Sequence, residues 1–92
     1  MDIPPPPAVY DQPYKGRLEV KQGSLAQVEH ICHTMEGIVS SYRALGCAKK
    51  FPGACFVMIP RIGGKVTAHM QAQIRRHEIA HCNGWPAHHP GS

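Results

Sequence analysis

The sequence predicts an α+β domain in which a few short strands pack on two helices. Residues 17–21 alternate between polar and apolar side chains, and residues 55–59 form a continuous apolar run that ends at Pro60; both patterns are typical of strands. Residues 25–35 and 68–83 instead carry apolar side chains at helical spacing. The chain shows no internal repeat and no heptad pattern, which favours a single small domain.

Length and charge limit the possible functions. The chain has 92 residues, a net charge of +4 with neutral histidines, and 42% apolar residues. A domain of this length buries only about 60–65% of its unfolded surface, so a metal or disulfides often add stability. The basic residues form two doublets, Lys49-Lys50 and Arg75-Arg76, and no longer run. We therefore expect no specific nucleic-acid partner, and no apolar run is long enough for membrane insertion.

The N-terminal residues 1–14 form a Pro-rich tail ahead of a single domain at residues 15–92. Residues 4–7 are four prolines, which favour an extended polyproline conformation. We expect a stiff linker that holds the domain away from a neighbouring surface, in preference to a docking ligand. Tyr10 and Tyr14 are expected to lie back on the domain.

The first half of the domain contains the first strand and the first helix. Leu18 and Val20 should face inward from the strand. Ser24, with Gln27 three residues later, forms a capping-box pattern that predicts the start of a helix. The apolar stripe of that helix is expected to pack on the second helix. Residues 38–50 fit either a short strand or a continued helix, followed by a basic loop.

Four cysteines lie within the predicted domain. No two of them form a CxxC pair, so a structural zinc knuckle is not indicated. An even number in a short chain fits one or two disulfides, with three possible full pairings, and the alternative is four buried thiols. Disulfides would favour a secreted or periplasmic location. The cysteines are Cys32, Cys47, Cys55 and Cys82.

The second helix carries the chemistry. Thr67 can cap it, and residues 77–81 read HEIAH, which is HExxH. Two imidazoles one helical turn apart, His77 and His81, can reach one metal ion from the same face. This is the helix motif of zinc peptidases, in which the intervening glutamate, here Glu78, acts as general base. We therefore expect Zn²⁺ as cofactor.

A catalytic zinc takes three protein ligands and keeps one position for water or substrate. No Asp or Glu follows Glu78, so a third ligand of that type cannot come from downstream. Gly84 can adopt the left-handed conformation that ends a helix and reverses the chain. Such a turn would return His88 or His89 toward the helix.

Residues 77–84, HEIAHCNG, resemble the start of the metzincin signature HExxHxxGxxH. The last histidine of that signature would fall on Ala87, and His88 and His89 lie one and two positions later. The longer string HEIAHCNGWPAHHPG is similar to small zincin-like proteins of bacteria, some of them linked to conjugal transfer. This resemblance implies a minimal zincin-like fold with His89 as the third zinc ligand, and His88 is the alternative.

These residues predict a zinc-dependent metallopeptidase. Glu78 would take a proton from a zinc-bound water and pass it to the leaving amine. The expected substrate is a peptide or protein, and the resemblance implies that the strand at residues 55–59 is an edge strand that pairs with it. Tyr42 is a candidate second electrophile by residue type alone. A chain this short should form a shallow cleft, which a partner protein could complete.

Two other functions stay open. A zinc-binding module without hydrolysis would use the metal to hold the fold while the domain binds a partner. A basic nucleic-acid-binding domain would show strong salt-dependent DNA binding. We expect the remaining histidines, His30, His33 and His69, to be ordinary surface or helix-packing residues and not metal ligands. Cys82 should be buried or disulfide-bonded, and Trp85 should anchor the turn.

Overall fold

The structure is a computed structural model that describes residues 3–41 and 45–87. Within these residues it confirms the α+β class, with four strands and two helices. Both predicted helices and both predicted strands form within two residues of the expected bounds. In chain order the elements are β1 (Arg17–Gly23), α1 (Leu25–Thr34), β2 (Ile38–Ser41), β3 (Cys47–Phe51), β4 (Ala54–Pro60) and α2 (Ala68–Cys82).

The four strands form one mixed sheet in the order β1-β4-β3-β2. Strand β1 runs parallel to β4, whereas β4, β3 and β2 are antiparallel neighbours. The expectation that residues 55–59 form an edge strand is wrong, because β4 lies inside the sheet with a partner on each side. Its continuous apolar run follows from this position, since an inner strand covered on both faces has no polar face.

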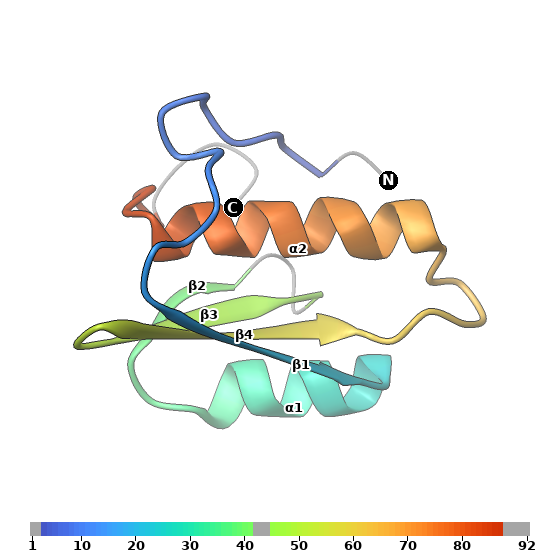
Figure 1. Ribbon diagram of the computed structural model, residues 1–92. Coiled ribbons are helices and arrows are strands. Elements are labelled where there is room, and N and C mark those ends of the chain that lie inside the picture. The colour runs from blue at the N-terminus through green and yellow to red at the C-terminus, as the bar shows by residue number, and fades with distance from the viewer. Residues whose placement is uncertain (1–2, 42–44, 88–92) are drawn as a thin grey trace.

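The two helices lie on opposite faces of the sheet, with the sheet between them (Figure 1). The expectation that α1 packs on α2 is therefore wrong. Side chains from β4 alternate between the faces: Val57 packs in the cluster that includes Ile74 of α2, and Met58 packs with Val28 of α1. Each helix covers its own half of the core because both faces of β4 need an apolar cover.

A disulfide links each helix to the sheet. Cys32 of α1 is bonded to Cys47 of β3, and Cys82 of α2 is bonded to Cys55 of β4. One of the three possible pairings is thus formed in full, and Cys82 is buried and disulfide-bonded as expected. In a small core, these two links fix both helix positions against the sheet.

Of the two alternatives for the residues after Gly37, the short strand is the one that forms, as β2, whereas β3 takes the place of the expected basic loop. Strand β3 pairs with β4 along its whole length, and its first residues, Cys47 and Ala48, are fully buried. The lysines that suggested a loop, Lys49 and Lys50, follow this buried pair toward the hairpin end. Tyr42, the candidate electrophile, lies outside the described residues.

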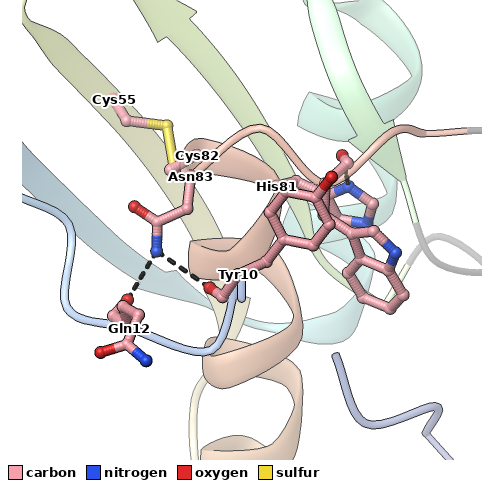
Figure 2. Close-up of a disulfide and its surroundings, with 7 residues drawn as sticks. Tyr10, Gln12, Cys55, His81, Cys82 and Asn83 are labelled. Carbon is pink, nitrogen blue, oxygen red and sulfur yellow. Dashed lines mark hydrogen bonds between the residues drawn. A yellow bond between two sulfur atoms is a disulfide. The ribbon is translucent and has the colours of Figure 1, made fainter. Parts of the chain in front are cut away.

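The Pro-rich segment lies along α2 and does not project as a linker (Figure 1). Ile3 is only 6% exposed and belongs to the core cluster on the α2 side. Asn83 Nδ2 donates to the carbonyl oxygens of Tyr10 and Gln12, at 3.0 Å and 2.6 Å (Figure 2). Tyr10 and Gln12 follow the four prolines, at a turn in which the backbone N–H groups of Tyr10 and Asp11 donate to Pro7 O, so Asn83 holds the chain at this turn. No helix in the described part of the chain is long and apolar enough to cross a membrane.

Candidate metal centre

Helix α2 places the HExxH residues against the body of the protein. Thr67 caps the helix, because its hydroxyl oxygen accepts a hydrogen bond from the Met70 backbone N–H at 3.1 Å. From this start, helical spacing turns Ile74, His77 and His81 toward the interior, as the sequence stripe predicts. His77 and Glu78 are 0% exposed and His81 is 1% exposed.

The two motif histidines direct the same ring nitrogen at each other. His77 Nε2 and His81 Nε2 lie 3.3 Å apart, and the ring centroids are 5.0 Å apart. Two nitrogens that each bind a tetrahedral zinc at about 2.0–2.1 Å lie about 3.3–3.4 Å from one another. The separation of the two nitrogens therefore fits shared coordination of one zinc ion.

Backbone carbonyls hold the other nitrogen of each ring. His77 Nδ1 lies 3.0 Å from the Pro4 carbonyl oxygen, and His81 Nδ1 lies 2.7 Å from the Trp85 carbonyl oxygen. A carbonyl oxygen can only accept a hydrogen bond, so each Nδ1 must carry the proton. In the neutral ring Nε2 is then the nitrogen without a proton, which is the form that binds a metal, and this outer contact fixes the ring orientation.

A tight turn after α2 brings the second of these carbonyls into place. The backbone N–H of Gly84 donates to His81 O, and that of Trp85 donates to Ala80 O, both at 3.1 Å. This pair of bonds is a Schellman motif, which requires a left-handed residue after the cap. Gly84 supplies it with φ of +104°, as the sequence predicts. The turn reverses the chain so that the Trp85 carbonyl faces His81.

Trp85 also packs on both histidines. Its ring stacks on His81 with a centroid distance of 4.7 Å and an interplanar angle of 10°. It meets His77 edge to face at 4.9 Å. The expectation that Trp85 anchors the turn is confirmed, and the indole in addition limits the movement of both imidazoles.

Glu78 is buried next to the two histidines on the sheet side of α2. Gly46, just before β3, lies under this part of the helix, because a Cβ at Gly46 would come within 3.4 Å of Glu78 Cγ and 2.7 Å of Ile74 Cγ2. The helix can approach the sheet this closely only because residue 46 has no side chain.

The third ligand is not decided by the described residues. His88 and His89, the two candidates, lie outside them. Within residues 3–41 and 45–87, no three His, Cys, Asp or Glu side chains are placed to hold a metal ion. The three other histidines are exposed as expected: His30, His33 and His69.

Arg76, an exposed residue of α2, holds the N-terminal segment. Its guanidinium makes a two-point ion pair with Asp11, including a 2.9 Å hydrogen bond from Nε to Oδ1. The hydrogen bond from Arg76 lowers the pKa of the Asp11 carboxyl, and the same contact raises the pKa of Arg76. Its neighbour Arg75 is also exposed.

Sequence reasoning missed Pro4, because it contributes a backbone carbonyl that no side-chain pattern reports. The carbonyl of Trp85 was foreseeable only in part, from the glycine that precedes it. Comparison of the chain with protein-family models, curated proteins and solved structures found no match.

Proposed function

We propose that this protein is a zinc-dependent metallopeptidase that hydrolyses peptide bonds in peptide or protein substrates. The observation that carries the proposal is the 3.3 Å separation of His77 Nε2 and His81 Nε2, with each Nδ1 held by a carbonyl. Two neutral imidazoles oriented in this way form two thirds of a catalytic zinc site.

The roles of the residues follow from their chemistry. When bound, zinc supplies the Lewis acidity that polarises a peptide carbonyl and makes a water molecule more acidic. Glu78, which lies between the two ligands in sequence, would accept a proton on its carboxylate as general base and deliver it to the leaving amine. Trp85 and the carbonyl of Pro4 keep the imidazoles in position.

His89 is the proposed third ligand, and His88 is the alternative. Elemental analysis of purified wild type, His88→Ala and His89→Ala distinguishes the two. The variant that has lost the true ligand should retain much less zinc than the other.

One observation favours a second function, a zinc-binding module without hydrolysis. His77, Glu78 and His81 are at most 1% exposed, whereas a peptidase must bring a substrate carbonyl to the metal. In this alternative the metal stabilises a small core and the domain binds a partner protein. A partner could also complete a shallow cleft in the peptidase.

Glu78→Gln separates the two functions. For a peptidase, this change should lower hydrolysis of an unfolded protein or a peptide library by about 10²–10⁴-fold, because the general base is lost. Zinc content should stay at the wild-type level, since Glu78 is not a ligand. Glu29→Gln, an exposed carboxylate on α1, is the matched control. A wild type that binds zinc but hydrolyses substrate no faster than the Glu78→Gln variant would favour the non-catalytic module.

The two disulfides bear on the compartment in which the protein would work, whichever of the two functions it has. Disulfides persist in oxidising compartments and are rare in reducing ones. We propose that the protein works in a secreted or periplasmic setting.

A further inference from the structure

The N-terminal segment at residues 3–12, which we call the clasp, reaches the candidate metal centre directly. Its second described residue, Pro4, accepts the hydrogen bond from His77 Nδ1 at 3.0 Å. This contact joins residues 73 positions apart in sequence. The orientation of one ligand therefore depends on a segment that belongs to no helix or strand.

Three further contacts hold the clasp against α2. Ile3 is buried in the core cluster at one end. At the other end Asp11 pairs with Arg76, and Asn83 donates to the carbonyls of Tyr10 and Gln12. Figure 2 shows the Asn83 side chain directed at these two carbonyls, beside the disulfide of the last helical turn. Arg76 and Asn83 flank the motif histidines in sequence. The clasp is therefore held by the same stretch of chain that carries His77, whose ring it orients.

We infer that docking of the clasp and binding of zinc are coupled, so that the clasp is a positioning element for His77. This inference rests on the proposed zinc site but not on peptidase activity. When the clasp is docked, the Pro4 carbonyl fixes the Nδ1–H tautomer and keeps Nε2 available for zinc. When the clasp leaves, His77 loses the hydrogen bond from Nδ1 to the Pro4 carbonyl, which is one of the contacts that fix its tautomer and ring orientation. Zinc must in turn favour the docked state by the same factor, because coupling between two binding events is reciprocal.

Charge reversal at the exposed end of the clasp tests the coupling in the full chain. Arg76→Glu places a carboxylate against Asp11 and should release the clasp without changing any residue that touches zinc. We expect the zinc affinity, measured by competition with a chromophoric chelator, to fall by about 10-fold or more, within the range for loss of an outer partner of a ligand. Arg75→Glu, on the same helix, is the control for the change of charge alone. Its zinc affinity should stay within about two-fold of wild type.

A rescue variant separates positioning from general damage to the helix. Asp11→Arg combined with Arg76→Glu restores the ion pair with reversed polarity. Its zinc affinity should return to within about three-fold of wild type, which a double-mutant cycle expresses as strong coupling between the two positions. Far-UV circular dichroism of each variant checks that α2 is intact.

The reciprocal measurement uses the wild type alone. Limited chymotrypsin digestion, followed by mass spectrometry, reports cleavage after Tyr10, and this rate tracks the undocked fraction when docking is fast. Zinc should slow this cleavage by a factor similar to the affinity loss in Arg76→Glu. It should leave the slower cleavage after Leu25, an exposed residue at the start of α1 on the opposite face of the sheet, unchanged.

The outcomes distinguish this inference from the proposed site. Equal zinc affinities for Arg76→Glu and Arg75→Glu, or zinc-independent cleavage after Tyr10 in a protein that binds zinc, would overturn the coupling and leave the metal site standing. A wild type that takes up no zinc would overturn both.

Discussion

At the scale of single residues, the candidate site depends on two carbonyl oxygens as much as on side chains. Each motif histidine donates a hydrogen bond from its Nδ1–H to a backbone carbonyl, His77 to that of Pro4 and His81 to that of Trp85. A carbonyl oxygen accepts a hydrogen bond and cannot donate one, so it selects the Nδ1–H tautomer of each neutral ring. The arrangement also means that substitutions which move the backbone should affect the ligands.

Gly84→Ala tests the carbonyl of Trp85. Gly84 has φ of +104°, so alanine there should cost about 1–2 kcal/mol through the backbone. The nearest atom to a new Cβ would be Tyr10 Cε1 at 4.0 Å, so no clash adds to this cost. Because the turn places the Trp85 carbonyl on His81, we expect the zinc affinity to fall as well. Urea unfolding and chelator competition measure the two effects.

The matched control for this prediction is Gly53→Ala. Gly53 is also left-handed, with φ of +71°, and a new Cβ would have nothing within 4 Å. It lies in the hairpin between β3 and β4, which belongs neither to α2 nor to the turn that follows it. Stability should fall by a similar amount while zinc affinity stays unchanged. Equal zinc affinities in the two variants would contradict the role of the turn.

At the scale of elements, each of the two disulfides joins a helix to a strand, but only one of them lies beside the candidate metal ligands. Each joins one helix to one strand of the sheet, on opposite faces. Only the bond between Cys55 and Cys82 involves the helix with the histidines, and Cys82 directly follows His81. This disulfide therefore holds the last turn of α2, and with it one candidate ligand, on β4.

Removing the disulfides one at a time should separate stability from metal binding. Cys55→Ala with Cys82→Ala, and Cys32→Ala with Cys47→Ala, should each lower the free energy of unfolding by about 3 kcal/mol, because each bond closes a loop in the unfolded chain. Only the first double variant should also lose zinc affinity, since it frees the end of α2. Chemical unfolding and chelator competition would test this, and equal zinc losses in both variants would show that the effect is a general loss of order.

At the scale of the whole molecule, the protein has a small apolar core on each face of its sheet. A disulfide on each face links the covering helix to the sheet. The α2 side includes Ile3, so the core extends to a segment without regular structure. A zinc ion bound at the end of α2 would connect this helix, the turn after it and, through His77, the clasp. Metal binding should therefore stabilise the entire fold.

Calorimetry with zinc and with a chelator tests this stabilisation. A ligand that binds only the folded state adds about 2.7 kcal/mol at a free concentration 100 times its Kd. For a domain of this size, each kcal/mol raises Tm by about 4–8 °C, so zinc should raise Tm by roughly 10–20 °C. His77→Ala should remove most of the shift, whereas His69→Ala, an exposed histidine on the same helix, should keep it. A shift of equal size in both variants would point to zinc bound elsewhere.

Local sequence determined the parts of this protein that depend on neighbours within one turn or one hairpin. Both helix starts follow from capping residues, Ser24 with Gln27 and then Thr67, which satisfy backbone N–H groups three residues away. The spacing of His77 and His81 likewise places both rings on one helical face, and Gly84 allows the turn that follows. The α+β class could be predicted for the same reason.

Only the tertiary structure decided how these elements meet. The apolar run of β4 indicates burial but not how many neighbours the strand has, so an edge position and an inner one could not be told apart. The same run left open which face each helix covers, and four cysteines allow three full pairings. The docking of Pro4 on His77 joins positions 73 residues apart through a backbone atom. Every residue type has the same backbone carbonyl, so residue type does not show which carbonyl makes this contact. Contacts of this kind are set by the packed fold, because no local pattern in the chain encodes them.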